Sequence, residues 1–186
     1  MQTNRRELLL GAGATLALAG LPSTACAANP DRKAEALLAR IAEMLLSDGP
    51  ESATSLGIDK GKRARLKHRL QNRSPAGQAM IASHLKGALA DLAKLDAGAL
   101  SPTMRVNVDV VRTSFESALA GFAFPYGDVA VGGWRNAPYV VVQNVGAFLD
   151  IPRMLDTDHQ IATPQDAEAY LDRLESYADQ LDGETE

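Results

Sequence analysis

Residues 163–181, TPQDAEAYLDRLESYADQL, carry a complete set of α-helix signals. Thr163 is a suitable N-cap, Pro164 suits the first helical position, and Asp166 stands three residues after the cap, close to a capping box. Apolar side chains then recur three and four residues apart, which is the spacing of one helical face. These positions are Ala167, Tyr170, Leu171, Leu174, Tyr177, Ala178 and Leu181. The stretch therefore predicts an amphipathic helix.

The same start signal, a polar cap residue followed by proline, occurs three more times, at Asn29-Pro30, Ser74-Pro75 and Ser101-Pro102. An apolar stripe with helical spacing follows each pair. The stripes run over residues 34–45, 81–95 and 108–122. The first predicted helix is ended by Asp48-Gly49-Pro50, and the second ends near Gly98. A short helix from Pro50 to Leu56, closed by Gly57, is also expected.

No segment of comparable length alternates apolar and polar residues with period two, so strands are not expected to dominate. The run Pro138-Tyr139-Val140-Val141-Val142 is β-branched and predicts either one short strand or a buried helical turn. We therefore expect a mainly α protein, a bundle-like array of amphipathic helices with one long connection rich in aromatic residues and glycine. Residues 28–186 form this helical domain, and residues 1–27 are interpreted as a signal peptide.

The signal peptide rests on two adjacent arginines, Arg5 and Arg6, followed by an apolar stretch from Leu8 to Leu21. That stretch is shorter than the roughly 20 residues of a membrane-spanning helix, so no stable membrane anchor is expected. The small residues of Ala25-Cys26-Ala27 favour cleavage after Ala27. The arginine pair favours the twin-arginine route, which predicts the twin-arginine export machinery and signal peptidase as partners and a periplasmic or secreted protein.

Cys26, the single cysteine of the chain, leaves one alternative open, because a cysteine at the end of a signal peptide can be lipidated. The preceding residues Ser23-Thr24-Ala25 lack the leucine expected three positions upstream, so we favour simple cleavage. The mature chain then has no cysteine, which excludes a thiol nucleophile, a redox pair and a cysteine-ligated zinc.

The charge and composition of the chain narrow the range of its possible binding partners. The 186 residues hold 19 Lys plus Arg against 23 Asp plus Glu, a formal net charge of -4, which argues against nucleic acid as a partner. The segment Lys60–Arg73 carries seven basic residues and no acid. It is either an anion-binding patch or, the interpretation we favour, a solvated segment whose Leu66 and Leu70 touch the core while its charges stay in water.

The connection from Phe122 to Gly146 holds five of the nine aromatic residues, broken by glycines and stiffened by prolines. A long irregular segment with aromatic rings often lines a binding cleft, but such rings as often fill gaps between helices, the role we favour. If a ligand binds there, the side chains expected to approach it are Trp134, Arg135, Asn136, Tyr139, Gln143 and Asn144.

Catalytic motifs are missing from the sequence. It contains no H-E-x-x-H, no histidine pair at helical spacing, no G-x-S-x-G and no phosphate-binding loop, so we expect no catalytic residue, no metal ligand and no cofactor in this chain. His68 and His84 are interpreted as surface or boundary residues. His159 has two acids nearby and could join a hydrophilic or metal site, although no second nitrogen donor accompanies it.

The succession of segments resembles the amino-terminal part of the bacterial family called domain of unknown function 885. The residues that carry the resemblance are Glu51–Ile58, Arg73–Gly77, Pro138–Ala147, Ile151–Leu155 and Ala167–Leu174, behind an export signal. Members of that family are long helical proteins that look like zinc metallopeptidases of the gluzincin type. Their H-E-x-x-H-like motif lies far downstream of these segments, so the resemblance implies zinc for longer relatives and gives no ligand here.

The resemblance implies that this chain is the opening portion of such a protein. Apolar stripes meant for absent partner helices would then be exposed, and the chain is expected to be helical but poorly packed. Two functions follow. The first is an exported helical fragment of a metallopeptidase-like hydrolase, non-catalytic alone, which helps to wall a cleft for a peptide substrate. The alternative is a self-contained periplasmic helical module that binds a ligand or partner through its aromatic connection.

Overall fold

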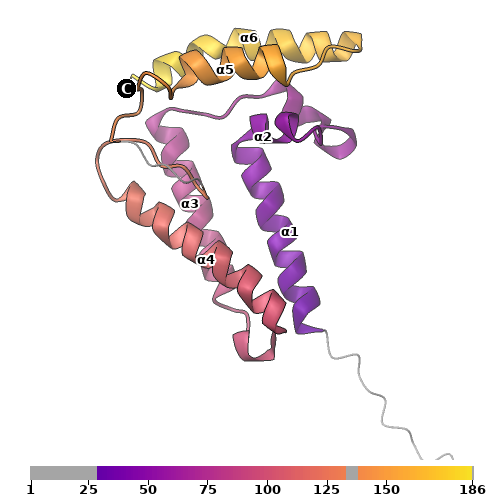
Figure 1. The fold of residues 1–186 in the computed structure, drawn as a ribbon, viewed down its shortest axis with the longest axis vertical. Coiled ribbons are helices and arrows are strands. Elements are labelled where there is room, and N and C mark those ends of the chain that lie inside the picture. Colours follow the sequence, from indigo (N-terminus) through magenta and orange to yellow (C-terminus); the bar gives the residue numbers. More distant parts are fainter. Residues whose placement is uncertain (1–28, 133–137, 186) are drawn as a thin grey trace, which may run out of the picture.

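A computed structural model describes residues 29–132 and 138–185, and within these ranges the regular elements are helices (Figure 1). The α-helices are α1 (Pro30–Asp48), α2 (Pro50–Ser55), α3 (Pro75–Leu92), α4 (Pro102–Phe122), α5 (Ala147–Thr157) and α6 (Pro164–Gly183), and the short 3₁₀ helices are η2 (Gly61–His68) and η3 (Ala97–Ala99). The part of the chain with described coordinates holds no strand, and Val142 and Val145 form only an isolated bridge. The predicted mainly α class is confirmed.

All four predicted helix starts are confirmed by their cap geometry. The side chains of Asn29, Ser74, Ser101 and Thr163 each accept a hydrogen bond from a backbone amide of the first turn, at 3.0–3.3 Å. The Asp166 carboxylate also accepts from the backbone amide of Thr163, which completes a capping box at the start of α6. Each cap satisfies an amide that the helix itself leaves without a partner.

The ends of the helices follow the sequence less closely. Helix α2 closes at Gly57, whose φ of 66° suits glycine, as expected. Helix α3, however, ends at Leu92 rather than near Gly98. The chain turns after Leu92, and Asp96 then caps the separate short helix η3 through the amide of Gly98.

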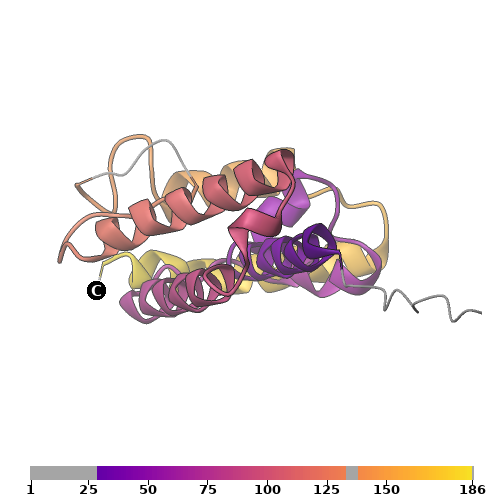
Figure 2. The same cartoon turned by 90° about the horizontal axis from the view of Figure 1, so that it is seen from below.

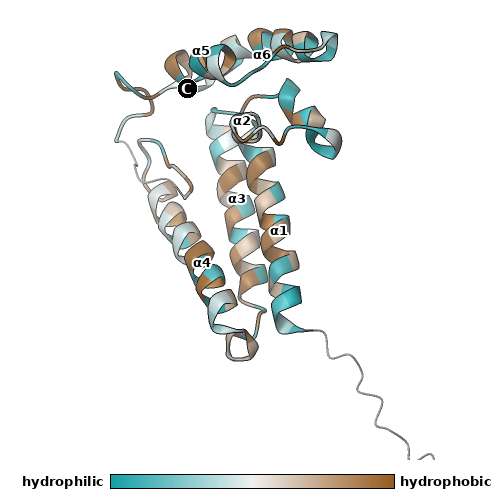
Figure 3. Cartoon of the chain, turned by 45° about the vertical axis from the view of Figure 1, so that its right-hand side comes forward, coloured by the Kyte–Doolittle hydropathy of each residue, from teal (hydrophilic) through white to brown (hydrophobic). Residues whose placement is uncertain are grey.

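The main core lies between α1, α3 and α4, which are the long rods of Figure 1, while α5 and α6 lie side by side across one end. Figure 2 shows the same arrangement from below, and Figure 3 shows apolar stretches along these helices. Leu85, Leu92 and Val108 are almost fully buried in this core. Burying side chains of this kind contributes about 1.5–3 kcal/mol each to the free energy of unfolding.

A second, smaller core joins α5 and α6 to the chain after η2. Its buried members are Leu70, Ala147, Ile151, Met154 and Leu155, with Tyr170, Tyr177 and Leu181 packed against them. This face of α6 differs from the predicted one. Leu171 and Leu174 are about half exposed, and the fully buried residues are Ala169 and the charged Arg173.

Helix α5 was not expected from the sequence, because Pro152 lies inside it and its N-cap Gly146 has no capping side chain. Proline has no amide hydrogen, so the carbonyl four residues earlier, that of Phe148, lacks its usual helical partner. The Tyr177 hydroxyl of α6 donates to this carbonyl at 3.4 Å. A tertiary contact therefore supports the helix at the position where the local sequence disfavours it.

The basic segment Lys60–Arg73 folds mainly as η2, with Leu66 and Leu70 buried as predicted. The expectation that its charges stay in water is wrong for two of them. Lys67 binds Asp166 at 2.6 Å and Arg73 binds Glu184 at 2.8 Å, and both cations are less than a fifth exposed. Two charges of this segment thus tie it to α6 and to the residue that follows α6.

Several large apolar side chains remain exposed, among them Val106 and Val110 on α4 and Ile161 before α6. The poor packing expected of the isolated chain stays a prediction. None of the described helices is long and apolar enough to cross a membrane.

Candidate functional site

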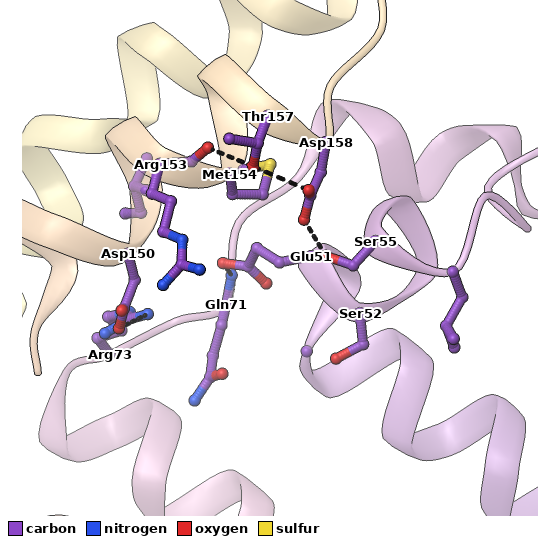
Figure 4. A pocket seen from close by; sticks show the side chains of 13 residues that line it. Glu51, Ser52, Ser55, Gln71, Arg73, Asp150, Arg153, Met154, Thr157 and Asp158 are labelled. Atoms are coloured by element: carbon purple, nitrogen blue, oxygen red, sulfur yellow. Dashed lines mark hydrogen bonds and ion pairs between the residues drawn. The ribbon is translucent and has the colours of Figure 1, made fainter.

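A polar groove of about 570 Å³ runs between α2, the segment after η2, and α5 (Figure 4). We call this cavity the polar groove. Its polar lining comes from Glu51, Ser52 and Ser55 of α2, Gln71 and Arg73 after η2, and Asp150, Arg153, Thr157 and Asp158 of α5 and its C-cap. Because three separate stretches of sequence meet here, only the tertiary fold assembles this site.

Asp158 forms the acidic end of the groove. Its carboxylate accepts hydrogen bonds from the hydroxyl groups of Ser55 and Thr157, the latter at 2.9 Å. The Ser55 hydrogen bond, then that of Thr157, and to a lesser extent the charge of Arg153, lower the pKa of Asp158 below its ordinary value. Asp158 therefore stays ionised and can accept N–H groups from a ligand.

Glu51 and Arg153 lie on opposite walls of the polar groove. The Glu51 carboxylate accepts from the backbone amide of Gln71 at 2.9 Å, which fixes its position. The Arg153 guanidinium extends from α5 toward Glu51 in Figure 4, and within the described residues it has no hydrogen bond or ion pair. An unpaired guanidinium is a strong donor for a carboxylate or a carbonyl oxygen.

Arg73 lines both the polar groove and a second pocket. Its guanidinium donates from Nη1 to Glu184 at 2.8 Å and from Nη2 to Asp150 at 3.3 Å. Burial alone would lower the pKa of Arg73, but the hydrogen bond to Glu184 and the charges of Glu184 and Asp150 raise it overall. The group is thus a permanent cation held between two acids.

The second pocket, of about 440 Å³, shares Arg73 with the polar groove, and we call it the aromatic pocket. It is formed by the start of α3, the end of α4, the connection after α4 and the residues at the end of α6. Phe122, Phe124 and Tyr126 supply its rings, and Arg73, Asp128 and Glu184 supply its charges. The aromatic connection therefore does line a cavity, although filling gaps was the role favoured from the sequence.

The structure places only some of the side chains that the sequence singled out. Tyr139, Gln143 and Asn144 are exposed, and none of them lines the polar groove or the aromatic pocket. Their neighbour Val140 does line the aromatic pocket. Trp134, Arg135 and Asn136 lie outside the described residues, as does the expected signal peptide, so these assignments stay predictions.

The sequence did not predict the polar and charged residues of the two pockets as site residues. Arg153 lies in the segment Ile151–Leu155 that carries the family resemblance, but neither it nor Asp158, Asp128 and Glu184 was assigned to a site, because they become neighbours of the other lining residues only through tertiary folding. The sequence did contain one indication that Arg173 is buried. Arg173 follows Ala169 by four residues and precedes Tyr177 by four, so it lies on a helical face that is otherwise packed.

Zinc, which the resemblance implies for longer relatives, does not fit the described residues of this chain. They contain no group of three or more His, Cys, Asp or Glu side chains that could hold a metal ion. The three histidines are occupied separately: His68 with Asp172, His84 with Asp48, and His159 with Arg173. His159 thus belongs to a buried hydrogen-bonded cluster rather than to a metal site.

The fold and these cavities define a mainly α-helical domain with a polar groove and an adjoining aromatic pocket. A model of the family described as "Bacterial protein of unknown function (DUF885)" matches residues 50–186. The chain belongs to this family, as the resemblance implied. Neither the curated proteins nor the solved structures gave a match.

Proposed function

We propose that this chain is the non-catalytic helical portion of an exported, metallopeptidase-like hydrolase, and that its polar groove takes an extended segment of peptide. The observation that carries the proposal is the guanidinium of Arg153, which has no hydrogen bond or ion pair within the described residues and shares one groove with Glu51 and Asp158. Peptide backbones present carbonyl acceptors and N–H donors in alternation, and this groove offers the complementary groups.

Each group has a distinct part in binding. Arg153 donates to a peptide carbonyl or a terminal carboxylate. Asp158, kept ionised by Ser55 and Thr157, accepts a peptide N–H, and Glu51 offers a second acceptor. These residues hold and orient the peptide, and no step of hydrolysis is assigned to them. The family resemblance supports the hydrolase part of the proposal, and the arginine pair with its apolar stretch supports export.

The peptide-binding part is tested by titrating the purified chain with a tri-alanine peptide, acetylated at one end and with a free carboxylate at the other, and following backbone amide shifts by NMR. We expect shifts at Ser52, Ser55 and Thr157. Arg153→Met, which keeps the aliphatic stem, should weaken binding about tenfold, because a charge-assisted hydrogen bond is lost. Arg32→Met, in an exposed position on α1, is the matched control.

Unchanged affinity in Arg153→Met, or shifts confined to other surfaces, would refute the groove as the peptide site. The non-catalytic part is tested by measuring peptide hydrolysis with the same preparation. We expect no turnover. Turnover that is abolished by changing a single side chain of this chain would refute that part.

The alternative, a self-contained helical binding module in the periplasm, is favoured by one observation: the aromatic connection lines a pocket. The genomic sequence after codon 186 distinguishes the two proposals. An open frame that encodes an H-E-x-x-H segment supports the hydrolase portion, and a stop with no such remnant supports the self-contained module.

A further inference from the structure

The aromatic pocket combines an apolar wall with charged groups at its base. Ala79, Ala82, Phe122, Val129 and Val140 contribute apolar surface, and the rings of Phe124 and Tyr126 stand at its rim, both more than half exposed. Their centroids are 5.8 Å apart and their planes are inclined by 43°. A cavity of this volume, mostly apolar with a few polar groups, is typical of a small-molecule site.

Negative charge is in excess at the base of this pocket. Glu184 is nearly buried and accepts from Arg73 and from the backbone amide of Ala147, and Asp150 also accepts from Arg73. Arg73 is therefore neutralised by two acids already. Asp128 is the second acid that lines the pocket, and among the described residues its carboxylate is bonded only to the backbone amide of Val129.

Among the described residues, the surroundings of Asp128 compensate the negative charge of its carboxylate poorly. Burial raises its pKa, the Val129 amide and the charge of Arg73 oppose that shift, and the charges of Glu184 and Asp150 add to it. Helices α3 and α4 bring no ionisable side chain to the pocket, and the phenol of Tyr126 is the one other titratable group that lines it in the described part of the chain. A bound cation would relieve this repulsion.

We propose that the aromatic pocket binds an organic cation, a protonated amine or a guanidinium on an apolar body, with Asp128 as its counter-ion and Phe124 and Tyr126 beside it. Aromatic faces attract cations through their quadrupole, and the attraction grows when water is partly excluded. An anionic ligand would meet two carboxylates, those of Asp128 and Glu184, and one cation, Arg73, that is already paired. A neutral ligand would leave the charge of Asp128 uncompensated.

The test compares three probes of the same size, namely benzylammonium, benzyl alcohol and benzoate, titrated into the purified chain and followed by NMR. We expect shifts at the amides of Gly121, Gly127 and Val129, with benzylammonium bound about tenfold more tightly than benzyl alcohol, and benzoate bound most weakly. The preference for the cation should decrease as the pH is lowered and Asp128 becomes protonated.

Two variants identify the groups responsible. Asp128→Asn should reduce benzylammonium binding to the level of benzyl alcohol, whereas Glu35→Gln, an equivalent change at an exposed position on α1, should not. Because Tyr126 is exposed, Tyr126→Leu is expected to fold normally and to weaken benzylammonium several-fold more than benzyl alcohol. Equal affinity for the two probes in the unmodified chain, or a cation preference that survives Asp128→Asn, would overturn the proposal.

The cation could be a free amine or the side chain of a peptide. An acetylated and amidated lysine peptide, titrated in the same way, distinguishes these sources: it binds with the same dependence on Asp128 if a side chain can enter, and fails to bind if only a free amine fits. Arg153→Met is expected to leave benzylammonium binding unchanged. An experiment that refutes cation binding in the aromatic pocket is therefore distinguishable from one that refutes peptide binding in the polar groove.

Discussion

Arg173 and His159 form the central polar contact between α6 and the residues that follow α5: Nη1 of the fully buried Arg173 lies 3.0 Å from Nδ1 of His159. The guanidinium also donates to the carbonyls of Arg69 and Leu66, to the Thr54 hydroxyl at 2.7 Å and to the Met154 sulfur. No carboxylate of the described chain bonds to it. Burial lowers its pKa, while Glu51 and Asp59 oppose the shift through their charges.

Replacing Arg173 should destabilise the protein strongly. In Arg173→Met the aliphatic volume is largely kept, but the buried acceptors of Thr54, Leu66 and Arg69 lose their donor. Each unsatisfied buried group costs about 1–3 kcal/mol, so the free energy of unfolding should fall by about 3 kcal/mol or more. Urea denaturation followed by circular dichroism measures this. Arg32→Met on the surface of α1 should change it by less than about 0.5 kcal/mol, and equal effects of the two changes would refute the role given to Arg173.

Stability should decrease as the pH falls below about 6.5, the ordinary pKa of histidine. His159 accepts from Arg173 at Nδ1 and donates from Nε2 to the Asp166 carbonyl, so the folded protein holds the neutral ring. Burial lowers the pKa of His159, the Asp166 carbonyl and Asp59 oppose the shift, and Arg173 and Lys67 reinforce it. The unfolded chain therefore binds the proton first, and stability is lost from about pH 6.5 downward.

The measurement is urea denaturation between pH 7.5 and 5, where this residue contributes a slope of at most about 1.4 kcal/mol per pH unit. His159→Gln, which retains an acceptor for Arg173, should have a shallower slope than the unmodified chain. If both proteins show the same slope in this interval, His159 is not the titrating group.

Two glycines of α3 should respond to alanine in opposite directions. A Cβ at Gly77 would lie 2.1 Å from the Asn72 carbonyl oxygen, whereas a Cβ at Gly87 meets nothing within 4 Å. Gly87→Ala should raise the free energy of unfolding by up to about 1 kcal/mol, because alanine is the better helix former. Gly77→Ala should lower it, because backbone must move. Stabilisation by both changes would contradict the close approach of the 72–77 segment.

The cap of α6 should be worth about 1 kcal/mol. Thr163→Ala removes the oxygen that accepts from the Asp166 amide at 3.2 Å and breaks the capping box. Thr163→Ser keeps the hydroxyl and should be close to neutral. Thermal or urea denaturation of both variants checks this, and an equal loss in Thr163→Ser would show that the methyl group rather than the cap matters.

The helix starts could be predicted because their signals are local. A cap residue followed by proline acts on the next few amides, so Asn29, Ser74, Ser101 and Thr163 were sufficient to place four helices. Helix α5 could not be predicted in this way. Its support at Pro152 comes from Tyr177, which is distant in sequence and close only after folding.

The helical class, the four helix starts, the burial of Leu66 and Leu70 and the family resemblance could be read from the amino-acid order, since each depends on short-range spacing or on an ordered series of segments. Three features depend on the folded chain instead: which face of α6 is buried, the position of Arg73 in the linings of both the polar groove and the aromatic pocket, and the placement of Arg153, Asp158 and Asp128. Hydrogen bonds and charges act over a few ångströms in space, and residues a hundred positions apart share that distance only once the chain has folded.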